Sequence, residues 1–68
     1  MSAILQFKVF CLENFRSEHN LSGAEALRIF KEYEVLDFLA DAYTPLHTQG
    51  ESYIVGSIDE YIEVRTPR

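Results

Sequence analysis

Apolar residues in the first third of the chain recur with helical spacing. Two sets share this spacing: Ile4, Cys11 and Phe15 in one, and Leu5, Val9 and Leu12 in the other. The pattern predicts a helix from about Ser2 or Ala3 to about His19. Because the two sets cover more than one narrow stripe, this helix is either central to the core or covered by a second chain.

A capping signal marks the start of a second helix. Ser22 can accept a hydrogen bond from the next turn, and Glu25 lies three residues on and can reach back to the Ser22 N–H. We therefore expect a helix over about 23–33, with a break near Glu34. Its expected inner face consists of Ala24, Leu27, Phe30 and Tyr33.

A short third helix is expected over about 35–43, with Asp37 and Asp41 facing outward together. Its apolar side consists of Leu36, Leu39, Ala40 and Tyr43, with Phe38 beside them. Pro45 is expected to end this helix, because its ring disfavours helical geometry at the preceding residue and it has no N–H to donate. A polar loop anchored by Leu46 should follow over 46–50.

The last third of the chain predicts one more helix. Tyr53, Ile54 and Val55 fit either a short extended segment or the beginning of this helix, and three residues do not decide. Gly56 and Ser57 are expected to start it, since Ser57 and Glu60 repeat the capping-box spacing. Ile58, Tyr61 and Ile62 supply the apolar stripe, and the helix should end near Arg65. The predicted fold is all-α: residues 1–68 form one small four-helix bundle with a long first helix and two short middle ones.

The net charge of −5 is unevenly distributed. Residues 1–31 sum to +1, residues 32–64 hold eight Asp or Glu and no Lys or Arg, and Arg65 and Arg68 add +2. Phosphate binding draws its affinity from Lys and Arg, so nucleic acid is a poor partner for the acidic stretch. A basic protein surface is a suitable one. The alternative is that the acids only solvate exposed helix faces.

The chain offers little for chemistry of its own. Cys11 is the single cysteine and lies in an apolar run, where a cysteine usually packs as a small core residue. His19 falls at a polar helix end, and His47 has no visible catalytic partner. We therefore expect no enzyme activity, no metal and no cofactor. A helix-turn-helix interpretation is also disfavoured, because its recognition helix would present Asp37 and Asp41 to phosphates.

Location and partners follow from what the sequence does not contain. The beginning of the chain has no basic region followed by a long apolar stretch, and no run reaches the length of a membrane span. We expect a cytoplasmic protein that does not bind a membrane.

The segment from His47 to Gly50 has two interpretations. As a structural turn, Gly50 would adopt a positive φ and His47 would donate to a nearby carbonyl. As a recognition loop, its imidazole and amide would contact a partner, helped by nearby tyrosines. The candidate partner-binding residues are His47, Thr48, Gln49, Tyr43, Tyr53, Asp37 and Asp41.

The chain also resembles a family of small bacterial proteins of unknown function. The resemblance rests on Leu46-His47-Thr48-Gln49-Gly50 and on the run Tyr53-Ile54-Val55 that follows, and it covers roughly residues 3–63. Members of that family are often encoded beside, or fused to, domains that look like ADP-ribosyltransferase toxins. The resemblance therefore implies an antitoxin or an accessory subunit, and it assigns no catalytic residue. Gly56 and Ser57 stand where many relatives carry an acidic pair.

Three functions follow as hypotheses. The first is a non-enzymatic protein-binding module that docks on a toxin-like enzyme with a basic surface. The second is a self-associating homodimer that buries the spare face of the first helix. The third is a transcription-linked regulator.

Overall fold

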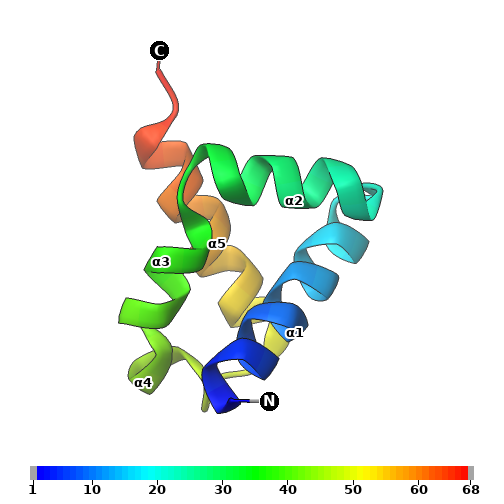
Figure 1. The fold of residues 1–68 in the computed structure, drawn as a ribbon. Helices are drawn as coiled ribbons and strands as arrows, with labels where there is room; N and C mark the ends of the chain where they lie inside the picture. Colours follow the sequence, from blue (N-terminus) through cyan, green and yellow to red (C-terminus); the bar gives the residue numbers. More distant parts are fainter. Residues whose placement is uncertain (1, 68) are drawn as a thin grey trace.

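The computed structural model describes residues 2–67, and within this range every regular element is helical. The helices are α1 (Ala3–Glu18), α2 (Gly23–Glu32), α3 (Val35–Asp41), α4 (Tyr43–Leu46) and α5 (Glu51–Arg65). The predicted all-α class is confirmed. In Figure 1, α2 crosses the end of the molecule opposite to α4 and the start of α1, and the long helix α5 passes behind α1 and α3.

Side chains and backbone geometry explain both ends of α1. The Ser2 hydroxyl accepts a hydrogen bond from the Leu5 N–H at 3.1 Å. At the other end Asn20 adopts a left-handed φ of 54°, which asparagine tolerates better than most residues. The Leu21 N–H then donates to the Arg16 carbonyl at 2.9 Å, and this bond closes a Schellman turn.

Helix α2 begins with the predicted capping box. The Ser22 hydroxyl accepts from the Glu25 N–H at 3.1 Å, and the Glu25 carboxylate accepts from the Ser22 N–H at 2.9 Å. This backbone hydrogen bond, together with the hydroxyl of Ser22, lowers the pKa of Glu25.

The inner face of α2 differs from the prediction. Ala26 and Phe30 are buried, whereas Ala24 and Leu27 are exposed. Both sets have helical spacing, so periodicity alone could not choose between them. Phe30 belongs to both sets and packs on Phe15 of α1, with ring centroids 5.1 Å apart. The tertiary packing of α2 then buries Ala26, one turn before Phe30, and leaves Leu27 37% exposed.

The chain breaks at Glu34, as predicted, where φ is 55°. Helix α3 ends at Asp41 rather than near Tyr43, so Pro45 is not the residue that ends it. Pro45 is the third residue of the one-turn helix α4. The first N–H groups of a helix have no intrahelical acceptor, so a proline is tolerated there. Leu46 is buried and anchors this turn in the core, as expected.

Helix α5 begins earlier than the sequence indicated. It starts at Glu51, so Tyr53, Ile54 and Val55 are helical and the extended alternative is wrong. Gly56 and Ser57 lie inside the helix, and Ser57 is not a cap: its hydroxyl donates to the Tyr53 carbonyl at 3.0 Å. The serine satisfies its hydroxyl one turn back, which a serine does readily inside a helix.

The core is formed by one stripe of each long helix and by the short helices between them. Helix α1 contributes Phe7, Cys11 and Phe15, and α5 contributes Ile54, Val55 and Ile58. Cys11 has no exposed surface, and burial raises the pKa of its thiol to about 12. The cysteine is therefore a core residue, as the sequence indicated.

Helix α1 packs on α2, α3 and α5, but the chain itself does not cover all of its apolar side chains. Leu5 and Val9 are exposed on one side, at 47% and 51%, and Phe10 is 45% exposed on another. Successive residues of a helix lie about 100° apart, so Val9 and Phe10 point in different directions. The helix thus has two separate apolar surfaces that the chain itself leaves open.

Candidate protein-binding site

A surface hollow of about 450 Å³ lies at the end of the molecule where α1 begins and α4 packs. Its residues come from four segments of the chain. Helix α1 contributes Ala3, Gln6, Phe7 and Phe10, and the rest are Tyr43, His47, Gln49 and Ile54. The lining is mainly apolar, and its polar side chains are those of His47, Tyr43 and two glutamines, Gln6 and Gln49. This composition is typical of a site that holds an apolar side chain and orients it with a few hydrogen bonds.

His47 is held in one orientation by Tyr43. The imidazole Nδ1 lies 2.7 Å from the Tyr43 carbonyl oxygen, and the two rings stack with centroids 4.3 Å apart at 6°. A carbonyl oxygen can only accept, so Nδ1 carries the hydrogen and the neutral ring has its lone pair on Nε2. His47 therefore offers a hydrogen-bond acceptor in a fixed direction.

Tyr43 is in turn fixed from below by α1. Its ring meets the buried Phe7 ring edge to face, with centroids 5.3 Å apart and planes at 85°. This geometry is favourable for aromatic pairs. The series Phe7, Tyr43 and His47 connects the core to the exposed imidazole, so contacts within the chain hold this side of the hollow in place.

The hollow brings together three of the residues that the sequence singled out and leaves out four. Tyr43, His47 and Gln49 line it. Thr48 is exposed beside it and is not part of the lining. Gly50 has φ −71°, not the positive value expected for the turn, because it is the N-cap of α5.

The other three predicted residues lie elsewhere. Tyr53 is 61% exposed on α5, and Asp37 and Asp41 are exposed on α3. Sequence reasoning missed Gln6 and Phe10, the contribution of α1. The excess of apolar residues on that helix was the available signal, but it did not indicate which of them would face α4.

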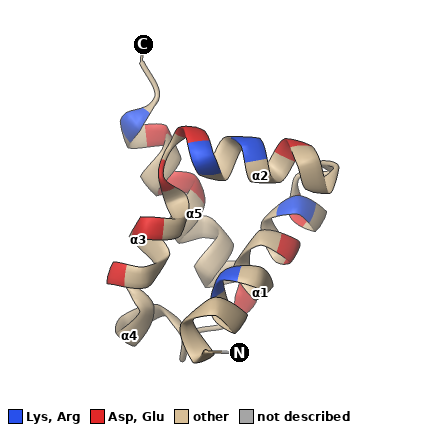
Figure 2. Ribbon diagram, in the orientation of Figure 1, with Lys and Arg blue, Asp and Glu red and all other residues tan. Residues whose placement is uncertain are grey.

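The charged residues are mixed on most helices. Figure 2 shows only acidic residues on α3, whereas α1 and α2 carry both acidic residues and the basic residues Lys8, Arg16, Arg28 and Lys31. The acids of α5 are not all on one face with those of α3, because Asp59 turns to α1 and bonds His19 at 2.8 Å. The acidic residues of the stretch 32–64 therefore form several small surfaces rather than one continuous acidic surface.

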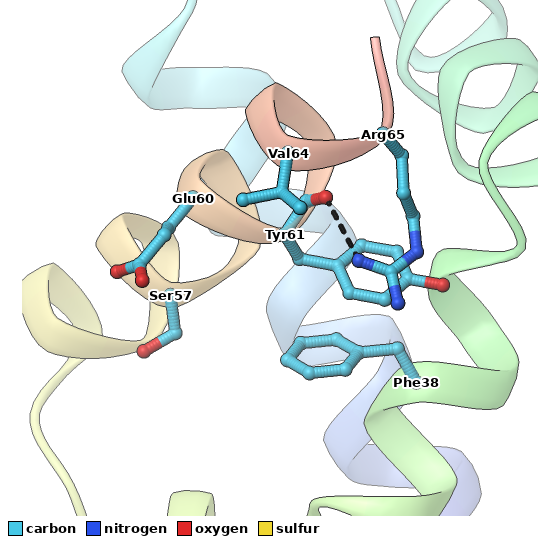
Figure 3. Close-up of a pocket in the computed structure, with 6 residues that line it drawn as sticks. All are labelled: Phe38, Ser57, Glu60, Tyr61, Val64 and Arg65. Carbon is cyan, nitrogen blue, oxygen red and sulfur yellow. Dashed lines mark hydrogen bonds between the residues drawn. The ribbon is translucent and has the colours of Figure 1, made fainter.

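A second hollow, of about 400 Å³, lies at the far end of α5 (Figure 3). Here the Phe38 and Tyr61 rings stack at 4.2 Å, and the Arg65 guanidinium covers the other face of Tyr61 at 3.7 Å from the ring centroid. The Arg65 side chain also donates to the Tyr61 carbonyl at 3.3 Å. These groups already satisfy one another, so this stack fastens α3 to α5 and offers less to a ligand than the hollow at His47.

Residues 2–67 contain neither a metal-ligand cluster nor a helix suited to crossing a membrane. No three side chains of His, Cys, Asp or Glu in this range converge as metal ligands would. None of the helices in the same range combines the length and the apolar character that crossing a bilayer requires.

Comparison with known proteins gives a family but no activity. Neither the curated proteins nor the solved structures contain a match to this chain. A family model described as a protein of unknown function, DUF3791, matches residues 6–65. The match spans α1 to α5 and includes nearly all of the hollow at His47. The chain therefore belongs to the DUF3791 family of proteins of unknown function.

Proposed function

We propose that this protein is a non-enzymatic binding module and that the hollow at His47 is where a protein partner docks. The observation that carries the proposal is Phe10, a large apolar side chain left 45% exposed at the edge of this hollow. Beside it the fixed Nε2 of His47 can accept one hydrogen bond. Apolar anchors surrounded by a few oriented polar groups are the usual centre of a protein interface.

The side chains available for chemistry support a binding role rather than catalysis. Cys11 is buried with a raised pKa, so it is a poor nucleophile. The Nδ1 of His47 is bonded to a backbone carbonyl and not to a carboxylate that would assist a general base. His19 is paired with Asp59 on the surface, away from the hollow.

The partner we propose is a toxin-like ADP-ribosyltransferase with a basic surface. Two features support this choice: the resemblance at residues 46–55, and the exposed Asp37 and Asp41 on α3, a helix without Lys or Arg. Complementary charge would speed the encounter and fix the register of the complex. In this role the protein acts as an antitoxin or an accessory subunit in the cytoplasm.

The test uses two matched substitutions on the same helix. Phe10→Gln removes the exposed anchor of the hollow, and Leu5→Gln removes a side chain of similar exposure on the other side of α1. The transferase-like protein encoded nearest to the gene is purified and titrated with each variant by calorimetry. We expect Phe10→Gln to weaken binding by at least about tenfold, and Leu5→Gln to leave it unchanged. Absence of binding by the unsubstituted protein, or equal losses in both variants, would refute the proposed site.

Self-association is a second candidate, and the exposed pair Leu5 and Val9 favours it. These residues are one turn apart and about half exposed, on a side of α1 that does not face the hollow. A second copy could cover them with its own α1. Light scattering after size exclusion tests this: a dimer that dissociates in Leu5→Gln supports self-association, and a monomer at all concentrations contradicts it.

A further inference from the structure

A third, smaller hollow lies between α1 and α5, further along α1 from the hollow at His47. It has a volume of about 120 Å³ and is lined mainly by polar side chains. Helix α1 contributes Asn14, Ser17 and Glu18, and α5 contributes Glu51, Ser52 and Val55. Glu51 follows Gln49 of the first hollow by two residues, so the chain itself connects the two.

The residues that α1 gives to the two hollows lie on one side of that helix. Ala3 and Phe10 belong to the first hollow and Ser17 to the third, and each is seven residues from the next. Seven residues are close to two turns, so side chains at this spacing face the same way. Asn14 lies between them, and its amide donates to the Phe10 carbonyl at 2.8 Å. The two hollows therefore lie in line along one side of α1, and together they make up the surface considered below.

The two ends of this surface differ in chemistry. The first end is apolar, with Phe10 as its exposed edge. The second end holds Glu18 and Glu51, and neither carboxylate belongs to an ion pair among residues 2–67. A cation placed between them would be attracted by both, whereas a carboxylate would be repelled.

We propose that this surface binds a helix of the partner that carries an apolar residue and a Lys or Arg about seven residues apart. From Phe10 to Ser17 the surface extends about 10 Å, the distance that seven residues of a helix cover. The apolar residue fills the hollow at His47, and the cation reaches Glu18 and Glu51. Recognition of an amphipathic helix in a groove is a common mode of binding. The inference rests on the proposed function and specifies the segment of the partner that docks.

The probes are side-chain-crosslinked, alanine-based helices of roughly 18 residues, or five turns. One peptide carries Phe and, about seven residues later, Lys, and a second carries the two residues in the reverse order. Each of these two peptides has one counterpart with Glu in place of Lys and another with Ala in place of Lys. Binding is measured by fluorescence anisotropy, and chemical-shift changes in the labelled protein locate the site. In at least one order, we expect the Lys peptide to bind about tenfold tighter than its Glu counterpart, with the Ala peptide between them.

Two double variants separate the charge at this site from the general acidity of the protein. Glu18→Gln with Glu51→Gln should abolish the preference for Lys over Glu and leave the Ala peptide unaffected. Glu60→Gln with Glu63→Gln removes the same charge from the other end of α5 and should leave the preference intact. Added salt should reduce the preference for Lys over Glu, because exposed charges are screened.

The outcomes distinguish this inference from the proposed function. Equal binding of Lys and Glu peptides, no binding by any peptide, or shift changes centred away from α1 and α5 would overturn the inference. If Phe10→Gln still weakens the complex with the purified partner in that case, the hollow remains the docking site and only the assigned segment is wrong. If Phe10→Gln does not weaken the complex with the purified partner either, both this inference and the proposed docking site are wrong.

Discussion

Gly56 and Ser57 provide the most direct test of the fold, because sequence and structure assign them opposite roles. The sequence places them at the start of a helix, whereas the structure places them in the sixth and seventh positions of α5. A Cβ added at Gly56 would meet nothing within 4 Å. Glycine inside a helix costs about 0.5–1 kcal/mol relative to alanine, so Gly56→Ala should raise the free energy of unfolding by about that amount.

Ser57→Ala is the companion substitution. In the structure the Ser57 hydroxyl bonds the Tyr53 carbonyl inside the helix, at 3.0 Å. Alanine loses this bond but is the better helix former, so we expect a net change within about 0.5 kcal/mol. If Ser57 were instead an N-cap, the same substitution would cost about 1 kcal/mol. The pair of variants therefore distinguishes a continuous α5 from a helix that starts at Ser57.

The assay is urea and thermal unfolding followed by circular dichroism. In a domain of this size, 1 kcal/mol corresponds to about 4–8 °C in Tm, so the gain from Gly56→Ala is measurable. Gly23→Ala is the control: Gly23 is the first residue of α2, also has open space around it, and should gain less than Gly56 because it is not in a helix interior. A loss of more than about 1 kcal/mol in Ser57→Ala, with no gain in Gly56→Ala, would show that our account of α5 is wrong.

Three further predictions concern the core and the turns. Phe15→Ala should lower the free energy of unfolding by about 3–5 kcal/mol, because the side chain is 4% exposed and packs on Phe30; a loss below about 1 kcal/mol in a urea titration would contradict that burial. Cys11 should resist thiol reagents until the protein unfolds. The pKa of Cys11 is raised in the folded state, so its contribution to the free energy of unfolding should not change with pH below about pH 8.5. Above that pH the free energy of unfolding should fall by up to about 1.4 kcal/mol per pH unit, and the fall should be smaller in Cys11→Ala. Glu34→Gly should stabilise by about 0.5–1 kcal/mol by relieving a left-handed φ, whereas Asn20→Gly should not; equal effects in chemical denaturation would contradict the strain at Glu34.

Local signals in the sequence were sufficient where the residues involved are neighbours in the chain. The capping box of Ser22 and Glu25 requires only four residues, and its hydrogen bonds are present. The break at Glu34 was also predicted, because no capping or apolar pattern in the sequence opposes a helix break at that position. The same rule failed at Ser57 and Glu60, where the identical spacing lies inside a helix. The difference is in the preceding turn, because Ile54 and Val55 are buried and extend α5 toward Glu51.

Choices between faces could not be made from spacing. On α2 the set that includes Ala24 and the set that includes Ala26 both have helical spacing and share Phe30. Only the packing of α2 against its neighbours shows that Ala26 is buried and Ala24 is exposed. The candidate site shows the same limit. The segment after Leu46 could be recognised as unusual, so His47 and Gln49 were found. Phe10 could not be found, because its place in the hollow depends on how α4 packs against α1.

The contrast between Cys11 and Phe10 separates what α1 needs for folding from what it offers to a partner. The core takes one residue per turn from this helix, at Phe7, Cys11 and Phe15, and the small Cys11 is the one with no exposed surface. The adjacent and much larger Phe10 remains 45% exposed, so it contributes only part of its apolar area to the fold. A polar residue at that position would leave the stripe intact and the protein more soluble. The exposed ring is therefore better explained by the proposed interface than by stability. Phe10→Gln should lose its partner and should lower the urea midpoint less than Phe15→Ala does, because only part of the Phe10 ring is buried.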